Sequence, residues 1–206
     1  MPVTTFKTLF GICIFTALFV SCNNTDQKAG QSQMQPTNSS QGNIQSPQVE
    51  SPESYESILK MDSLNTDVRL RLAAYYYTNK NLDKALYHYQ LVNRIDKKNM
   101  AAIFNLGNLY YDTQQNEKAI IYYEKFLESD KNNSNVRCDL ATCYKNLNQT
   151  QKAISILREN IKLNSNHPQS HFNLSVMLKE SGKNKEAEEE LKLYNNLVSH
   201  QPGKIN

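Results

Sequence analysis

The sequence predicts an all-α protein made of stacked helical hairpins, and three observations lead to this fold class. Within residues 100–133 the apolar residues recur at helical spacing in two runs, with a polar loop at 113–116 between them. The same pattern recurs every 34 residues without an insertion. Small residues also recur at the two positions where the paired helices would cross. Because one hairpin cannot bury its own apolar face, we expect several hairpins to stack.

The repeated positions define a predicted structural core. On each first helix a leucine precedes a small residue, and on each second helix an alanine lies at the crossing. Two antiparallel helices approach to about 8–10 Å only where such a small side chain lies between them. The predicted core residues are Leu72, Ala73, Ala85, Leu106, Gly107, Ala119, Leu140, Ala141, Ala153, Leu174, Ser175 and Ala187.

The repeat resembles the tetratricopeptide repeat (TPR) family. The family signature is Leu-Gly, then Tyr, then Ala, then an aromatic residue, and it is met by Leu106, Gly107, Tyr110, Ala119 and Tyr123. This resemblance implies a right-handed superhelical solenoid of helix-turn-helix units. The chain departs from the family at one position of the first helix, where a tryptophan is common. The residues at that position are Arg69, Ile103, Arg137 and His171.

Residues 1–21 are expected to be a signal peptide. A mostly apolar run at 9–20 is too short for a bilayer span, which needs about 20 residues, but it suits a secretory signal. The run ends in Ser21 and Cys22, which resemble the lipobox of bacterial lipoproteins and imply lipidation of Cys22 after cleavage before it. Phe19 departs from the lipobox, where leucine is usual. The alternative interpretation is an ordinary cleaved signal with a coincidental cysteine.

Residues 22–54, which begin with the cysteine, are predicted to form a disordered tether. They are mostly Gln, Asn, Ser, Thr, Pro and Gly, so they cannot bury enough apolar surface to offset the entropy of ordering. The interspersed prolines argue against a prion-like segment. Residues 55–65 align with a second helix at an offset of 34 residues. We therefore expect a single half-repeat helix that covers the first full unit.

Four full units are expected to follow, and the last has the character of a terminal repeat. Glu188 and Asn195 replace apolar residues of earlier units at positions that would face a further repeat. Residues 202–206 are expected to form a frayed tail. The predicted units are residues 66–99, 100–133, 134–167 and 168–201.

Composition and motifs exclude several classes of function. The formal net charge of +3 is too small to indicate binding to a polyanion. Cys138 and Cys143 lie on one predicted helix, too far apart to form a disulfide with each other. His167 and His171 have a spacing that can bind a metal, but no third ligand accompanies them. Phosphate-binding loops and nucleophile motifs are also absent, so the sequence predicts a non-enzyme that needs no cofactor, metal or nucleic acid.

In the TPR family the first helices line a concave groove that binds extended peptides or partner helices. The residues that match the groove here are Leu70, Tyr77, Phe104, Asn108, Tyr111, Lys145, Phe172 and Lys179, followed by Ala74, Cys138, Thr142 and Val176. Aromatic residues in a partly exposed groove are common anchors of recognition. The alternative is that they fill a groove that has no ligand. The Lys and Asn clamp with which some chaperone-binding members hold a terminal carboxylate is missing, so that function is not expected.

These features lead to the hypothesis of a non-enzymatic scaffold. It would be a TPR lipoprotein of a diderm bacterium, anchored in the outer membrane through Cys22 and facing the periplasm or the cell surface. Through its groove it would bind a protein or peptide and recruit that partner to a cell-envelope complex. Two alternatives stay open, which are a pilotin or assembly lipoprotein of an outer-membrane machine and an accessory subunit of an envelope enzyme.

Overall fold

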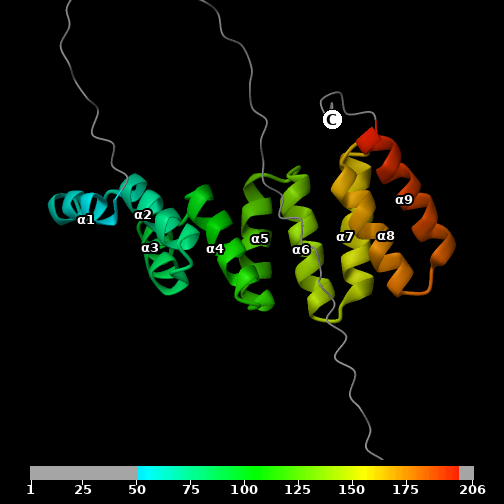
Figure 1. The fold of residues 1–206 in the computed structure, drawn as a ribbon, viewed down its shortest axis with the longest axis horizontal. Helices are drawn as coiled ribbons and strands as arrows, with labels where there is room; N and C mark the ends of the chain where they lie inside the picture. The colour runs from blue at the N-terminus through cyan, green and yellow to red at the C-terminus, as the bar shows by residue number, and fades with distance from the viewer. Residues whose placement is uncertain (1–50, 200–206) are drawn as a thin grey trace, which may run out of the picture. The chain divides into compact units, whose positions relative to one another are not determined.

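The computed structural model describes residues 51–199, which contain nine α-helices and no β-strand within that range (Figure 1). The predicted signal peptide, Cys22, the tether up to residue 50 and the tail at 202–206 lie outside the described residues. No helix of the described part is long and apolar enough to cross a membrane. The helices are α1 (Pro52–Met61), α2 (Thr66–Thr78), α3 (Leu82–Ile95), α4 (Met100–Asp112), α5 (Asn116–Ser129), α6 (Ser134–Asn146), α7 (Thr150–Leu163), α8 (Pro168–Glu180) and α9 (Asn184–Ser199).

The helices pack as successive hairpins, so the predicted all-α stack is confirmed. The closest pairs are α2 with α3, α4 with α5, α6 with α7 and α8 with α9. Each second helix then packs against the first helix of the next hairpin, and α1 packs against α2. Figure 1 shows the helices following one another in chain order, from α1 in cyan to α9 in red.

Helix α1 begins earlier than the sequence analysis placed it. It starts at Pro52 instead of residue 55 and ends at Met61, so the last residues of the predicted tether are helical. The Ser51 hydroxyl accepts a hydrogen bond from the Ser54 amide at 3.3 Å, and proline is well suited to the first helical position because it has no amide proton to leave unpaired. Tyr55 and Leu59 are buried, and they form the side of α1 that covers the first hairpin.

Asparagine starts the first helix in three of the four hairpins. Its side-chain oxygen accepts a hydrogen bond from the amide three residues further on, which satisfies one of the unpaired donors at the helix start. These pairs are Asn65 with Val68 at 3.0 Å, Asn99 with Ala102 at 3.0 Å and Asn133 with Val136 at 3.1 Å. In α8 this cap is replaced by Pro168 at the first helical position.

Each hairpin reverses its direction through one residue with a positive φ angle. These residues lie 34 positions apart, so all four hairpins use the same turn. They are Lys80, Gln114, Asn148 and Gly182, with φ angles of 60°, 59°, 60° and 77°. Only the last turn has glycine, the residue that adopts this left-handed conformation without a steric penalty from a Cβ atom.

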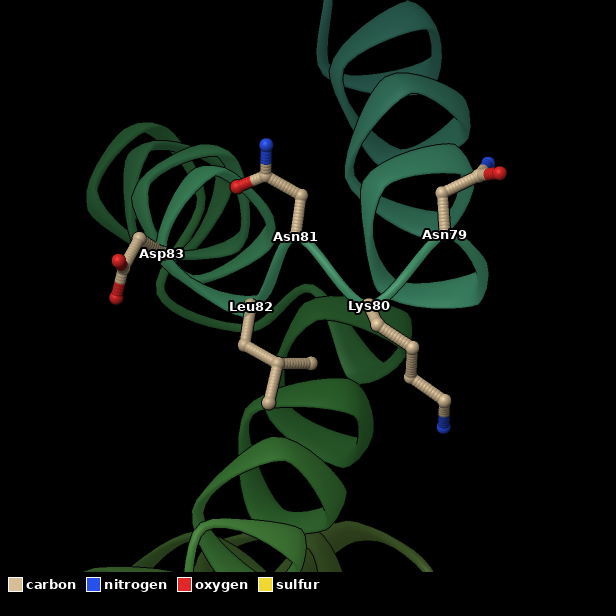
Figure 2. Close-up of a pocket in the computed structure, with 5 residues that line it drawn as sticks. All are labelled: Asn79, Lys80, Asn81, Leu82 and Asp83. Atoms are coloured by element: carbon tan, nitrogen blue, oxygen red, sulfur yellow. The ribbon is translucent and has the colours of Figure 1, made fainter.

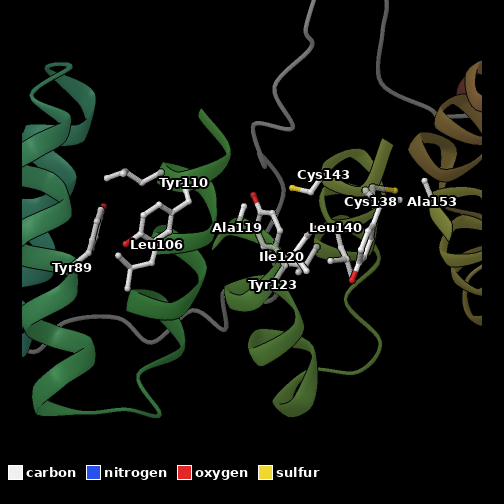
Figure 3. Close-up of a cluster of buried hydrophobic side chains, with 14 of the residues drawn as sticks. Tyr89, Leu106, Tyr110, Ala119, Ile120, Tyr123, Cys138, Leu140, Cys143 and Ala153 are labelled. Carbon is white, nitrogen blue, oxygen red and sulfur yellow. The ribbon is translucent and has the colours of Figure 1, made fainter. Parts of the chain in front are cut away.

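The twelve residues predicted for the structural core are all buried. Figure 3 shows part of this core, including Leu106, Ala119 and Leu140. The alanines at the helix crossings, Ala73, Ala85, Ala119, Ala141 and Ala153, have no exposed surface at all. The small residues therefore lie where the paired helices meet.

The approach of the two helices is tightest at Gly107. A Cβ atom at this position would lie 2.7 Å from Cε1 and 2.8 Å from Cδ1 of Tyr123. The hydroxyl of Tyr123 donates a hydrogen bond to Oδ1 of Asn108 at 2.9 Å. This bond holds the tyrosine ring across Gly107, so the ring cannot move away to make room for a side chain.

A recurring tyrosine links each of the first three full hairpins to the helix that precedes it, which for the first hairpin is α1. Its hydroxyl hydrogen-bonds a side chain of the preceding second helix, and a lysine of its own hairpin lies over its ring as a cation–π contact. The hydrogen-bonded pairs are Tyr76 with Glu56 at 3.0 Å, Tyr110 with Gln90 at 3.0 Å and Tyr144 with Glu124 at 2.7 Å. The lysines are Lys84, Lys118 and Lys152, at 4.8, 5.2 and 3.9 Å from the ring centres.

The last hairpin keeps this link with different chemistry. Leu178 stands in place of the tyrosine, and the two flanking charges are exchanged, because Arg158 replaces the acid and Glu186 replaces the lysine. The guanidinium of Arg158 pairs directly with the carboxylate of Glu186. An electrostatic attraction between neighbouring second helices is therefore present even where the tyrosine is missing.

We expect Gly107→Ala to destabilise the fold by up to about 2 kcal/mol. Overpacking against Tyr123 costs about 1–3 kcal/mol, and the higher helix propensity of alanine, about 1 kcal/mol, offsets part of it. Urea unfolding followed by circular dichroism measures the difference.

The residues of the first hairpin indicate which double variant is the matched control for this substitution. It has Ala73, Ala74 and Tyr89 where the second has Gly107, Asn108 and Tyr123, so no amide holds its tyrosine ring. The double variant Gly107→Ala/Asn108→Ala should be at least as stable as Asn108→Ala alone, because the freed ring can shift. If Gly107→Ala alone is more stable than wild type, as the helix propensity of alanine by itself would make it, the tight crossing is not a constraint.

Candidate functional site

The predicted groove residues lie on the four first helices, α2, α4, α6 and α8. We call the surface that these residues form the first-helix face. Of these twelve residues eight are partly buried, Ala74, Phe172 and Lys179 are exposed, and Cys138 is buried. The side chains that also pack against the core are Leu70, Tyr77, Phe104 and Tyr111. The face therefore carries aromatic side chains that the core positions and that remain partly accessible.

The surface hollow in Figure 2 lies elsewhere, at the turn between α2 and α3. It is lined by Asn79, Lys80, Asn81, Leu82 and Asp83. All of these except Leu82 are exposed, and Figure 2 shows their side chains spreading away from the turn. Since no polar groups converge on one point there, this hollow is not a candidate binding site.

The aromatic surface is interrupted at the third hairpin. In the second hairpin Phe104 packs on Phe126 with ring centres 5.6 Å apart. In the fourth, Phe172 packs on Tyr194 at 5.2 Å. The residues at the matching positions of the third hairpin are Cys138 and Asn160, and both are buried. The aromatic residues of the second and fourth hairpins therefore do not form one continuous strip.

Cys138 does not line the face, although the sequence analysis assigned it there. Its side chain is 2% exposed. The Sγ atom lies 3.4 Å from Oγ of Ser170 and 3.6 Å from Nδ2 of Asn160. The same Nδ2 donates to Oγ of Ser170 and to the backbone oxygen of Ser134, each at 2.8 Å. A polar network contributed by α7 and α8 covers this short side chain, which a pattern within one helix could not reveal.

His167 takes part in this network. Its Nε2 donates to Oδ1 of Asn135 at 2.9 Å, and its Nδ1 accepts from the hydroxyl of Ser170 at 2.8 Å. Burial, and then the charge of His171, lower the pKa of His167, in agreement with this neutral ring. His171 is bonded elsewhere, through Nδ1 to the Glu190 carboxylate at 2.6 Å. No group of three or more His, Cys, Asp or Glu residues in the described range could hold a metal ion.

Two polar residues predicted to contact a partner already have partners within the chain. Oδ1 of Asn108 accepts the hydrogen bond from Tyr123, and Nζ of Lys145 lies 2.9 Å from Oε1 of Glu180. Both contacts come from other helices, so the spacing of residues along one helix did not indicate them. The aromatic residues are therefore better candidates for recognition than Asn108 or Lys145.

The first-helix face also carries two carboxylates that the sequence analysis missed. Asp112, at the end of α4, accepts a hydrogen bond from the hydroxyl of Tyr77 on α2. Asp139, on α6, is partly buried, and this burial, followed by the charge of Asp112, raises its pKa to about 6. The signal in the sequence is that only the third unit has an acid at this position. The corresponding residues of the other units are Arg71, Asn105 and Asn173.

Asp139 lies near the aromatic side chains of the preceding hairpin. Burial raises the pKa of Tyr111 to about 12, and the charge of Asp139 contributes to the same shift. Burial and then Asp139 likewise raise the pKa of the Cys143 thiol to about 12. The backbone of α2 closely approaches that of α4, and the backbone of α6 closely approaches that of α8. The backbones of α4 and α6 have fewer close approaches than either of these pairs. Asp139 and Tyr111 thus lie at the looser junction between the first helices.

Comparisons with known proteins agree with the repeat architecture. The family model described as anaphase-promoting complex, cyclosome, subunit 3, a TPR-like repeat model, matches residues 112–193. The solved structures that are similar include several of MamA, a TPR-repeat protein. The chain has a tetratricopeptide-repeat fold.

Three of these MamA structures show how far the similarity to the TPR array extends. MamA MSR-1 in its C2 crystal form is 22% identical, with 72% of this chain and 85% of that chain covered and a TM-score of 0.63. MamA AMB-1 in its P212121 form is 23% identical, with 73% and 82% covered and a TM-score of 0.64. The MamA RS-1 ArsTM double mutant is 15% identical, with 75% and 89% covered and a TM-score of 0.69. No curated protein matches the chain in sequence.

These similarities concern the fold of the chain. Stacked repeats create extended surfaces on which a partner can lie. A TPR-like fold therefore suggests protein–protein interaction.

We expect Asp139→Asn to stabilise the protein at neutral pH. Between its ordinary pKa of about 4 and about 6, folded Asp139 keeps a proton that the unfolded chain has lost. The free energy of unfolding therefore falls as the pH rises through this window. At about pH 7 the variant should be more stable than wild type by on the order of 1–2 kcal/mol, and near pH 4 the two should be equal. Urea unfolding at a series of pH values measures this, and parallel curves for the two proteins would show that Asp139 carries no such cost.

Proposed function

We propose that this chain is a lipid-anchored TPR scaffold that recruits a protein partner to a cell-envelope complex through its first-helix face. The observation that carries the proposal is the set of partly exposed aromatic side chains on successive first helices, Tyr77 on α2 and Phe104 and Tyr111 on α4. Aromatic residues that are fixed on one side and accessible on the other are the usual anchors of protein interfaces. An extended partner segment would lie across these helices.

The spacing of the aromatic residues supports one continuous binding surface. Phe104 and Tyr111 are two helical turns apart and so share a face of α4. The hydroxyl of Tyr77 bonds Asp112, the neighbour of Tyr111, which brings the aromatic residue of the first hairpin up to those of the second. Phe104 is also held by Phe126 behind it. Three rings from two hairpins are therefore available to one ligand.

The membrane anchor is supported by the sequence alone. The apolar run at 9–20 ends in Ser21 and Cys22, and this pattern favours cleavage and lipidation at the cysteine. The polar segment that follows would act as a flexible spacer. At about 5–6 Å times the square root of its length, its typical reach is about 30 Å. A scaffold on such a tether could meet partners embedded in the same membrane.

If Cys22 is the lipid anchor, Cys22→Ala should change where the protein is found. Wild type should incorporate labelled palmitate and partition into the detergent phase of a Triton X-114 extraction. The variant should remain unlabelled, and it should be found either in the aqueous phase or as the unprocessed precursor. Equal labelling and equal partitioning of both proteins would refute the lipoprotein hypothesis.

The binding surface is tested by Phe104→Ala/Tyr111→Ala. We expect this double variant to lose the partner that wild type captures in an in-cell crosslinking pull-down, because a buried interface aromatic is commonly worth 2 kcal/mol or more. Both side chains also pack on the core, so some stability will be lost as well.

Tyr122→Ala is the matched control for that loss of stability. Tyr122 is a partly buried aromatic of the second helix α5, stacked on Tyr110 with ring centres 5.5 Å apart. It should weaken the fold in a similar way but leave capture intact. Capture retained by Phe104→Ala/Tyr111→Ala would place the binding surface elsewhere. If envelope-enzyme activity co-purifies with wild type, the chain is an accessory subunit of that enzyme.

A further inference from the structure

The charge on the first-helix face indicates the chemistry of the partner. We propose that the partner contributes an extended segment whose arginine side chain lies against Tyr77 and Tyr111 and pairs with Asp112 and Asp139. This inference rests on the proposed function of the face and makes it more specific.

The four side chains come from three successive first helices. Tyr77 of α2 bonds Asp112 of α4 through its hydroxyl. Tyr111 precedes Asp112 in the chain, and the charges of Asp139 and Asp112 both act on its hydroxyl. The two carboxylates also act on each other, although they belong to different hairpins. A cation placed beside Asp112 would therefore lie against the hydrogen-bonded Tyr77–Asp112 pair. It would also be within the electrostatic range of Asp139.

Neither acid has a cationic partner within the described part of the chain. The ion pairs found within residues 51–199 are Arg137 with Glu159, Lys145 with Glu180, Arg158 with Glu186 and His171 with Glu190. No hydrogen bond to the Asp139 carboxylate is found in the same range. A partly buried carboxylate without a counter-charge is unfavourable, and a cation supplied by a partner would remove that cost. An acidic segment would be repelled from the same place.

Arginine fits this surface better than lysine does. Its planar guanidinium offers several donors at once, so it can bridge two carboxylates, and its flat face stacks on aromatic rings. Lysine carries a compact charge that is more strongly hydrated and lacks the flat face. The tyrosine rings provide the stacking surface, and a cation over such a ring is attracted to it.

The third hairpin sets the limit of this surface. In the hairpin that carries Asp139, the positions of Phe104 and Phe126 are occupied by Cys138 and Asn160. Both of these residues are buried. The next charged group of the first-helix face, Lys145, is already paired with Glu180. The partner segment would thus lie over α2, α4 and the near side of α6, with its arginine at the α4–α6 end.

A peptide-display selection tests this directly. The full chain, immobilised in detergent, is used to select short random peptides from a display library. The same selection is run on Asp112→Asn/Asp139→Asn and on Phe104→Ala/Tyr111→Ala. The matched control is Glu128→Gln/Glu189→Gln, which removes the same charge from exposed positions of second helices α5 and α9. Selected peptides are then synthesised with arginine or with its neutral analogue citrulline, and their affinities are measured by fluorescence anisotropy.

We expect arginine to be enriched among peptides selected by wild type and by the control. The Asp112→Asn/Asp139→Asn protein and the citrulline peptides should each lower the affinity about tenfold or more, as loss of a close charge pair does. Selected peptides without arginine, or affinities that the two Asp→Asn changes leave unaltered, would overturn this inference and leave the proposed function standing. If wild type enriches no peptides beyond those that Phe104→Ala/Tyr111→Ala enriches, both this inference and the proposed function are overturned. Circular dichroism of each variant confirms that the proteins compared are folded.

Discussion

The arrangement of the whole array depends on how closely the two helices of each hairpin approach at one small residue. Gly107 is the tightest case, since a Cβ atom there would meet the ring of Tyr123. Ala73, Ala141 and Ser175 occupy the same place in the other hairpins and are also buried. This contact sets the spacing between first and second helices. It thereby also sets where each first helix presents its outward side chains, so the binding surface follows from the packing of the core.

The joints between hairpins use weaker interactions whose chemistry can vary. Three joints have a tyrosine hydroxyl bonded to an acid or amide, with a lysine over the ring, and the last has the Arg158–Glu186 pair in its place. The Arg158–Glu186 pair is exposed, and such a pair commonly contributes about 0–1 kcal/mol. The tyrosine hydrogen bonds are partly buried, and a hydrogen bond contributes about 0.5–1.5 kcal/mol. They keep neighbouring hairpins in register, whereas the buried leucines and alanines supply most of the stability. This division explains how the terminal joint can change its residues and keep its geometry.

The first-helix face contains a carboxylate, Asp139, that we expect to oppose folding at neutral pH. Asp139 is a partly buried carboxylate without a counter-charge in the described part of the chain, and this burial, followed by the charge of Asp112, raises its pKa. Natural proteins keep locally unfavourable residues where function requires them. The Asp139 carboxylate lies near Tyr111, one of the tyrosines proposed to bind the partner. This coincidence distinguishes the α4–α6 junction from the buried Asn160 network, whose polar groups are mostly bonded to one another.

The 34-residue pattern was enough to predict the fold class and the positions of the small and apolar core residues. They repeat every 34 residues because helix crossing imposes the same size limit in each hairpin. Tertiary structure decided which polar residues remain accessible, because their partners come from other helices. Asn108 is held by Tyr123, Lys145 by Glu180, and Cys138 lies beneath Asn160 and Ser170. The proximity of Asp112 to Asp139 was equally hidden, since the spacing of residues along one helix contains no information about the neighbouring hairpin.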